Sequence, residues 1–318
     1  MLVFVKSNYS KTGLGRLAYS LKIHKNCEII YIDKISDTNQ HKGAIGLFCG
    51  FMPSELFQNY SVKNKYYLFC SPFGQAELSF PSKNYFPNEI LLLRELYTLK
   101  KNNIVKNIIT PSKSVANRMG FIYLPPIRII DHSQLKICKD RKNYGFLGDN
   151  IRRHKNVFNQ IAAISMLLPK EPIIVDYDTF LYYGETCKEL FDCELQFKDG
   201  LSDDNKFIQE IKTHRLGFQC SWSESFDYLA LEYCLCGVPI ICSYCIDWFP
   251  PLDKSFNMYV HNNDSYIDIL NTSKLILSDE SFYWELSEHI QEFCTKMNED
   301  NKEKLMNILN NNFFNGLR

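Results

Sequence analysis

Residues 215–243 constrain the fold more than any other stretch of this 318-residue chain. An apolar run at 216–220 predicts a short buried strand, and the polar turn that follows it carries Glu224. Residues 228–236 predict a helix that ends at a glycine, and the apolar residues 239–242 predict a second buried strand. The stretch therefore predicts a strand–turn–helix–strand unit with a carboxylate at its mouth.

Glu224 and Glu232 stand eight residues apart in this unit. If the whole span were helical, about 12 Å of rise and about 800° of rotation would leave the two side chains on roughly the same side. Both could then face one elongated ligand, and the free N–H groups at the start of the helix could bind an anion or sugar hydroxyls. The alternative is an ordinary buried unit with two solvated carboxylates.

The two glutamates and their surroundings resemble the donor-sugar site of the large family of retaining glycosyltransferases with the GT-B fold. In that family Glu, seven residues and a second Glu precede a small-residue helix and a Gly-x-Pro-hydrophobic strand, as do Glu224, Glu232 and residues 236–241 here. The resemblance implies that Glu224 contacts the transferred sugar and that Glu232 holds the nucleotide ribose. It also implies an α/β fold of two Rossmann-like domains whose parallel sheets face a central cleft.

Three residues directly after Glu224 would belong to the same donor site, namely Ser225, Phe226 and Asp227. Many members of the family have glycine on each side of this phenylalanine. Ser225 and Asp227 therefore depart from the family pattern, which leaves the exact contacts to the sugar open.

A basic loop is expected after a second-half strand at 144–147 and before an amphipathic helix at 157–168. Clustered cations beside a helix N-terminus suit a diphosphate leaving group, because fixed dipoles and point charges meet its two negative charges. The residues that form this candidate diphosphate site are Gly148, Arg152, Arg153 and Lys155.

Relatives commonly have an Arg just after this glycine and a Lys several residues later. Here Asp149 occupies the first place, so Arg152 or Arg153 would substitute, while Lys155 fits the second. The resemblance implies that these cations do the work of a divalent metal, so we expect neither a metal nor another cofactor. The alternative is a basic loop on the surface.

The turn Gly13-Leu14-Gly15 follows the first expected strand, at 2–5, and precedes a helix at 16–24. Glycines permit a tight turn and close approach of a ligand to the backbone, and the helix presents its positive N-terminus. The pattern by itself is weak. The suspected family has a glycine-rich loop in this place that faces the acceptor and the donor phosphates, and the resemblance implies that role here.

Further apolar runs alternate with helical patterns and predict a parallel sheet in the first half, with strands at 28–32, 44–49, 66–70 and 107–110. Ser112 is expected to cap the next helix and Gly120 to end it. At the C-terminus, separate helices are predicted at 264–277, 280–297 and 301–309.

The length of the chain suits two domains of about 150 residues each. We expect a Rossmann-like acceptor domain at 1–125, a linker at 126–143, and a Rossmann-like donor domain at 144–300. Residues 301–318 would form a helix and tail that pack back on the first domain.

Charge is distributed unevenly, although the net charge is zero. Residues 1–142 contain 21 Lys and Arg against 9 Asp and Glu, a net charge of +12, and the remainder carries −12. A basic half suggests an anionic partner such as a membrane surface, a phosphorylated glycan, a glycolipid or DNA. The alternative is that two domains of opposite sign attract each other.

The 12 cysteines are interpreted mainly as small hydrophobes, because most of them fall in apolar strands or helices. A zinc site at Cys234, Cys236, Cys242 and Cys245 is not favoured, since two would lie on a helix and two at the far end of a strand. The N-terminus reads as a strand and not as a signal peptide, and no apolar run reaches about 18 residues. We expect a cytoplasmic chain that is soluble or peripheral at a membrane.

These features together favour a retaining transfer of a hexose-type sugar from a nucleotide diphosphate to an anionic or membrane-associated glycan or glycolipid. One alternative is a DNA-modifying glycosyltransferase of the kind that some phages encode, acting on a hydroxylated base. Another is a non-catalytic binding protein that kept the GT-B fold. The departures at Asp149, Ser225 and Asp227, and the absence of a His after the fourth strand, motivate that last reading.

Overall fold

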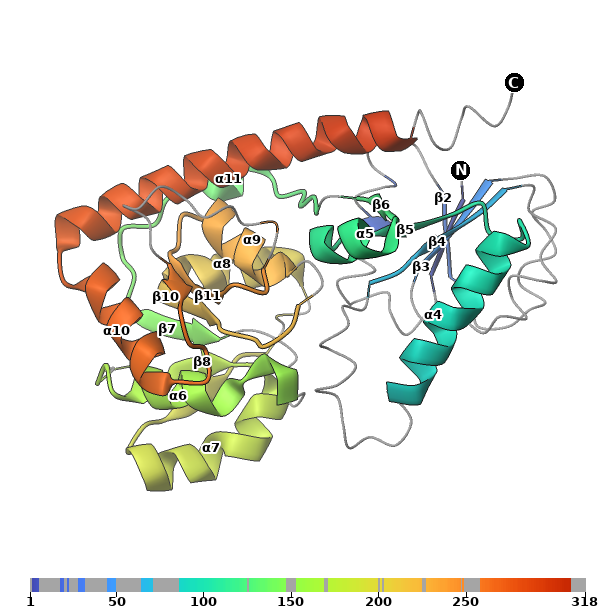
Figure 1. Cartoon of the computed structure of the whole chain (residues 1–318). Coiled ribbons are helices and arrows are strands. Elements are labelled where there is room, and N and C mark those ends of the chain that lie inside the picture. The colour runs from blue at the N-terminus through green and yellow to red at the C-terminus, as the bar shows by residue number, and fades with distance from the viewer. Residues whose placement is uncertain are drawn as a thin grey trace. The chain divides into compact units, whose positions relative to one another are not determined.

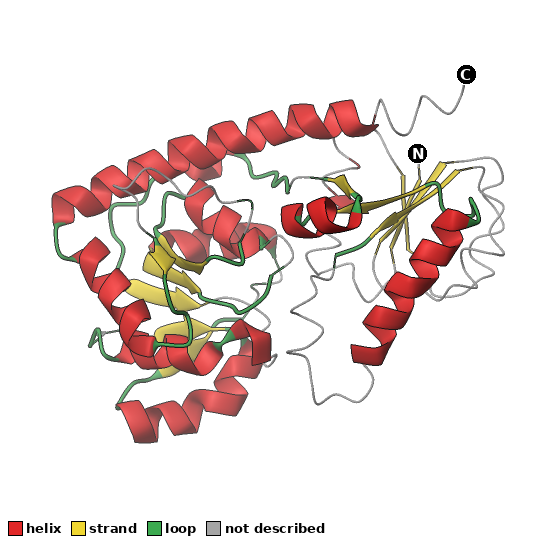
Figure 2. Ribbon diagram, in the orientation of Figure 1, coloured by secondary structure: helices red, strands yellow, loops and turns green. Residues whose placement is uncertain are grey.

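The structure is a computed structural model of the chain, and Figure 2 shows it coloured by secondary structure. The described residues are 2–5, 18–19, 22, 28–31, 45–49, 64–70, 86–124, 126–146, 153–168, 171–199, 201, 203–224, 227–246, 248 and 258–309. They divide into two compact units, one of residues 1–129 with 298–318 and the other of residues 130–297.

The first unit contains a parallel sheet with the strand order β2-β1-β3-β4-β5-β6. This is the order of flavodoxin-like sheets with one further strand at the edge. Its strands are β1 (Leu2–Val5), β2 (Glu28–Tyr31), β3 (Ile45–Cys49), β4 (Asn64–Leu68), β5 (Asn107–Thr110) and β6 (Ile122–Tyr123). Strand residues such as Val3, Leu47 and Ile108 are fully buried, as expected where both faces of a parallel sheet are covered.

Helix α4 (Phe86–Lys101) leads into β5, and helix α5 (Lys113–Met119) follows it. Ser112 caps α5, because its hydroxyl accepts a hydrogen bond from the Val115 N–H at 3.4 Å. Gly120 ends the helix in the left-handed region, with φ of 62°. The predicted serine cap and glycine stop are confirmed.

The second unit contains a parallel sheet with the order β12-β11-β10-β7-β8-β9. Counted along the chain this is 6-5-4-1-2-3, the Rossmann order, with its reversal between β7 and β10. Its strands are β7 (Asn143–Phe146), β8 (Ile173–Val175), β9 (Leu195–Phe197), β10 (His214–Gln219), β11 (Ile240–Ser243) and β12 (Tyr259–Val260). The predicted α/β class with two parallel sheets is confirmed.

Helices cover both faces of this second sheet (Figure 1). Helices α6 (Val157–Ser165) and α7 (Tyr177–Phe191) lie on one side, where α10 (Tyr266–Leu277) packs against α6. Helices α8 (Asp204–Thr213) and α9 (Tyr228–Leu235) lie on the other side and pack against β10. Both faces of the second sheet are therefore covered by helices.

Two glycines let aromatic rings pack directly on the centre of this sheet. A Cβ added at Gly145 of β7 would lie 1.8 Å from the His214 ring, and one at Gly217 of β10 would lie 2.4 Å from the Tyr233 ring. His214 Nδ1 and Tyr233 Oη are hydrogen bonded at 2.6 Å, and both side chains are fully buried. This close approach fixes α9, which carries Tyr233, on β10.

Helix α11 (Glu280–Leu309) is one continuous helix of 30 residues. The prediction of two helices with a break at 298–300 is therefore wrong. Asn298, at the expected break, is buried and uses its side chain outside the helix: Oδ1 accepts from the Arg128 N–H at 2.9 Å, and Nδ2 donates to the Arg128 carbonyl at 2.8 Å. The polar residues at 298–301 thus mark a contact of the helix and not its end. No helix among the described residues is long and apolar enough to cross a membrane.

Replacing Asn298 by Ala is expected to destabilise the first unit by roughly 2–4 kcal/mol, because two buried backbone groups of Arg128 would lose their partner. Urea denaturation followed by circular dichroism measures the change. Asp300→Ala, an exposed position on the same helix, is the matched control and should shift the midpoint little. Equal midpoints for the two variants would contradict the structural role of Asn298.

Candidate functional site

The candidate site lies where β7 and β10 leave the second sheet. The two strands are parallel neighbours, with Gly145 paired to Gly217, so both chains emerge at the same edge. The strand order reverses between them, and the crevice at such a reversal is where open α/β sheets bind ligands. The segment after β7 reaches Lys155, and the segment after β10 reaches Glu224.

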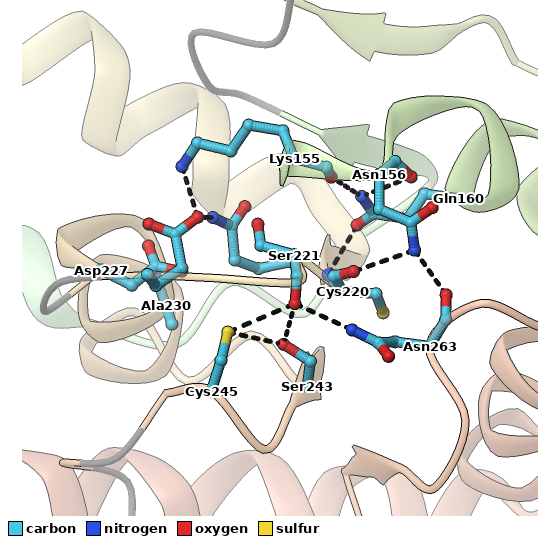
Figure 3. A network of polar contacts seen from close by, with 12 residues as sticks. Lys155, Asn156, Gln160, Cys220, Ser221, Asp227, Ala230, Ser243, Cys245 and Asn263 are labelled. Carbon is cyan, nitrogen blue, oxygen red and sulfur yellow. Dashed lines mark hydrogen bonds and ion pairs between the residues drawn. The ribbon is translucent and has the colours of Figure 1, made fainter. Parts of the chain in front are cut away.

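The side chain of Gln160 ties these two segments together (Figure 3). Its Nε2 donates to the carbonyls of Lys155 at 2.7 Å and Asn156 at 3.1 Å, and its Oε1 accepts from the Cys220 N–H at 2.8 Å. Gln160 lies on α6 and is fully buried, so water does not compete for these bonds. The backbone around Lys155 is therefore held in a fixed position relative to β10.

Asn156 adds a second link between the same segments. Its backbone is left-handed, with φ of 54°, a conformation that Asn tolerates better than most residues. Its Nδ2 donates to the Cys220 carbonyl at 3.0 Å and to the Asn263 carbonyl. A backbone bond from Trp222 N–H to the His154 carbonyl at 2.8 Å completes the connection.

A third set of contacts holds the Ser221 carbonyl, one residue further along (Figure 3). It accepts hydrogen bonds from Ser243 Oγ at 2.5 Å, Asn263 Nδ2 at 2.9 Å and Cys245 Sγ at 3.2 Å. These donors come from the end of β11 and from the segment after β12. Loops at three strand ends are thus joined into one polar network beneath Glu224.

Lys155 and Glu224 form a buried ion pair at the centre of this network. Their Nζ and Oε1 atoms are 2.5 Å apart, and each residue is 8% exposed. Gln219, the last residue of β10, also donates from Nε2 to Glu224 Oε1 at 2.9 Å. Burial raises the pKa of Glu224, but the charge and hydrogen bond of Lys155 outweigh it and hold the pKa below its usual value.

Asp227 is the second carboxyl group at this place, and its backbone is unusual. It caps the N-terminus of α9, with Oδ1 accepting from the Ala230 N–H at 3.3 Å, and its φ is 39°. Positive φ is the region that favours glycine, which accounts physically for the glycine that the suspected family often has here. Asp227 is 7% exposed, and its Oδ2 makes no hydrogen bond to a described residue.

The environment of Asp227 favours its neutral form. Burial and the nearby charge of Glu224 raise its pKa to about 7, against the opposing effect of Lys155. Two carboxyl groups thus share one ammonium group, and Glu224 holds it. The arrangement gives one ionised carboxylate and one group that exchanges a proton near neutral pH.

Glu232 lies on α9 and is fully buried. The predicted order is confirmed, because α9 begins at Tyr228 and Glu224 stands in the turn before it, so the span from Glu224 to Glu232 is not helical throughout. Glu224 lies at the sheet edge, whereas Glu232 lies within the helix that packs on β10. The structure therefore brings together Lys155, Glu224 and Asp227. The role of Glu232 stays a prediction.

Several predicted site residues lie outside the described residues, namely Gly13, Leu14, Gly15, Gly148, Arg152, Ser225 and Phe226. Arg153 begins the short 3-10 turn that ends at Lys155. The proposed roles of Arg153 and of the seven residues outside the described ranges stay predictions.

Three residues of the network were not expected from the sequence: Gln160, Asn156 and Gln219. The available signal was a polar residue at an apolar position of a helix or strand. Gln160 follows the pattern that places Val157, Ile161 and Ile164 in the core, and it is as buried as they are. A buried amide needs partners, so such a residue points to a local network.

Among the described residues, no group of three or more His, Cys, Asp or Glu side chains is arranged to hold a metal ion. Asp176 and Asp178 have the Asp-x-Asp spacing of an acidic metal-binding pair. Asp176 instead caps α7, with its carboxylate accepting from the N–H groups of Asp178 and Thr179. The described cysteines are free thiols.

No protein-family model and no curated protein matches the chain. Solved structures match over most of its length. HepE from Anabaena, solved with UDP and glucose, is 11% identical with a TM-score of 0.67, over 96% of this chain and 99% of HepE. Sucrose-phosphate synthase from Thermosynechococcus elongatus is 14% identical with a TM-score of 0.65, over 86% of this chain and 74% of that one.

TarM from S. aureus, solved with fondaparinux, α-GlcNAc-glycerol and UDP, is 14% identical with a TM-score of 0.61. The match covers 83% of this chain and 55% of TarM. Similarity at these identities establishes the fold. The predicted GT-B architecture of two Rossmann-like domains is therefore confirmed.

Replacing Asp227 by Asn is expected to remove a pH dependence of stability near neutrality. The pKa of Asp227 is about 7 in the folded chain and about 4 when unfolded. The folded chain keeps a proton that the unfolded chain loses, so this carboxyl group makes stability fall as pH rises through that interval. The free energy of unfolding of the D227N variant should exceed that of the wild type by roughly 1–3 kcal/mol at pH 8.5. The two values should be equal near pH 4.

Urea denaturation at both pH values measures this difference. Asp264→Asn is the control, because Asp264 is exposed, and it should show no such pH dependence. A difference between D227N and wild type that is the same at both pH values would show that Asp227 titrates normally.

Proposed function

We propose that the chain is a glycosyltransferase that takes a sugar from a nucleotide diphosphate bound at the carboxyl edge of the second sheet. The observation that carries the proposal is the buried Lys155–Glu224 pair at the reversal between β7 and β10. A cation and a carboxylate held rigidly at this edge provide one group for a diphosphate and one for sugar hydroxyls.

Lys155 is proposed to stabilise the leaving diphosphate, together with Arg152 and Arg153 of the same segment. The Gln160 and Asn156 hydrogen bonds fix the backbone from which Lys155 extends, so little reorganisation is needed when charge develops on the leaving oxygen. The cations take the part that a divalent metal plays elsewhere, and the proposed reaction is metal-independent.

Glu224 is proposed to accept hydrogen bonds from hydroxyl groups of the transferred sugar. Its pKa lies below its usual value, so it is ionised at neutral pH and both of its oxygens can only accept hydrogen bonds. Gly148, Ser225, Phe226 and Asp227 complete the proposed donor site. The ribose role of Glu232 rests on the family resemblance alone, since the side chain is fully buried.

The finer assignment is a retaining transfer of a hexose-type sugar to an anionic or membrane-associated glycan or glycolipid. The bond from the anomeric carbon to the phosphate oxygen breaks, the acceptor oxygen bonds to the same face of that carbon, and its proton passes to the leaving phosphate. The support is the Glu-x7-Glu resemblance and the +12 charge of residues 1–142. The Gly13-Leu14-Gly15 turn is proposed to face the acceptor and the phosphates.

Uridine diphosphate sugars are the first donors to test, because HepE was solved with UDP-glucose and TarM with UDP. In Glu224→Gln the side chain keeps its shape and loses its charge. We expect kcat/KM for sugar transfer or donor hydrolysis to fall about 100-fold, because hydrogen bonds to a charged acceptor are lost in the transition state. Full activity in E224Q would refute the role of Glu224.

The binding of uridine diphosphate tests the cation separately. Lys155→Met should weaken binding about 10- to 100-fold in calorimetric titrations, since one charge-assisted contact to the diphosphate is removed. Lys198→Met is the matched control. Lys198 pairs with Glu210 at 2.7 Å near His214, at the opposite end of β10, and its removal should leave affinity within about threefold. Equal losses in both variants would favour a general destabilisation over a phosphate contact.

A further inference from the structure

The cost of Asp227 to the folded chain suggests a function for this residue. Its backbone is held at φ of 39°, where a residue with a Cβ is strained by about 1 kcal/mol or more. One carboxyl oxygen is buried with no hydrogen bond to a described residue, which adds a further penalty. Glycine would avoid both costs, so the side chain is expected to contribute something other than stability.

Gln219 acts on both carboxyl groups. Its Nε2 donates to Glu224 Oε1 at 2.9 Å, and its amide lowers the pKa of Asp227, as a hydrogen-bond donor does. Gln219 Oε1 is buried and has no donor among the described residues, as is true of Asp227 Oδ2. Each of these two atoms is a buried acceptor that lacks a donor in the described part of the chain. A proton on Asp227 would supply a donor that an ionised carboxylate lacks.

The groups that face Asp227 come from three segments. Lys155 belongs to the segment after β7, and Glu224 to the segment after β10. Cys242 lies on β11 and Cys245 just beyond it, and burial raises the pKa of both thiols, so they stay neutral. His154 acts on Glu224 from beside Lys155. Among the side chains that the structure describes, which do not include those of Arg152 and Arg153, Lys155 is the lysine or arginine that faces the two carboxyl groups.

Donor binding changes this balance, and the argument from here rests on the proposed function. A diphosphate that attracts Lys155 draws the ammonium group away from Glu224 and brings two further negative charges. Two buried carboxylates without a counter-ion repel each other, and one of them then binds a proton, as in other acid pairs.

We propose that the Glu224–Asp227 pair takes up one proton from solvent when a nucleotide sugar binds, so that Asp227 enters the donor complex as a neutral carboxylic acid. The proton bonds to Asp227 Oδ2, and no other bond forms or breaks. In this form Asp227 can donate a hydrogen bond to a sugar hydroxyl, while Glu224 remains an acceptor. The pair thus offers one acceptor and one donor to the sugar.

Isothermal titration calorimetry tests the proposal directly. UDP-glucose is titrated into the full chain in two buffers of different ionisation enthalpy, because its diphosphate diester does not titrate between pH 6 and 8. We expect an uptake of about half a proton per bound ligand or more between pH 7 and 8, falling toward zero at pH 6. Heats that do not depend on the buffer would overturn the proposal.

Asp227→Asn keeps the shape of the neutral acid and cannot take up the proton. Whatever its affinity for UDP-glucose, the binding heat of D227N should not depend on the buffer, and its affinity should no longer change between pH 6 and 8. The same proton uptake in D227N would place the proton elsewhere and overturn the assignment. Asp227→Gly removes the side chain and its backbone strain, so it tests the same loss of uptake if D227N folds poorly.

Failure of the proposed function gives a different result. If neither UDP-glucose nor GDP-mannose binds the folded wild-type chain at millimolar concentration, no donor site of this class is present, and both proposals fall. If a nucleotide sugar binds without proton uptake, the donor site stands and only the role of Asp227 falls.

Discussion

The candidate site depends on the hydrogen bonds that hold the segment after β7 against the segment after β10. Parallel neighbours deliver both segments to one edge of the sheet, but a shared edge alone does not align side chains. The buried amide of Gln160 joins the Lys155 carbonyl to the Cys220 N–H, and Asn156 joins the same segments from its side chain. A lysine and a glutamate 69 positions apart thereby meet at 2.5 Å.

The charged groups at this edge of the sheet are not arranged to maximise the stability of the folded chain. One ammonium group serves two carboxyl groups, Glu224 and Asp227, and the second is left partly neutral. A buried ion pair gains little over an apolar pair of similar size, and a strained, partly unpaired aspartate costs more than a glycine. Structures keep such costs where the groups bind or react, which is consistent with a donor-sugar site.

The sequence predicted elements well where a local signal sets them, and the site less completely. Short apolar runs placed β1 to β5 of the first sheet and β7, β10 and β11 of the second, and the Ser112 cap and Gly120 stop follow from local backbone chemistry. The predicted break in α11 failed because the polar residues near Asn298 bond outside the helix, which depends on tertiary contacts. Lys155 and Glu224 were predicted as site residues from the chemistry of their motifs. The contacts of Gln160 and Gln219 and the burial of Glu232 depend on tertiary packing, which a single sequence does not show.

A crystal structure of the chain with uridine diphosphate would show whether Lys155 binds the donor phosphates. We expect the diphosphate to lie at the carboxyl edge of β7 and β10, with a phosphate oxygen accepting a hydrogen bond from Lys155 Nζ, which is drawn away from Glu224. A nucleotide bound away from this edge, or a diphosphate with the Lys155–Glu224 pair still at its ligand-free distance, would contradict this expectation.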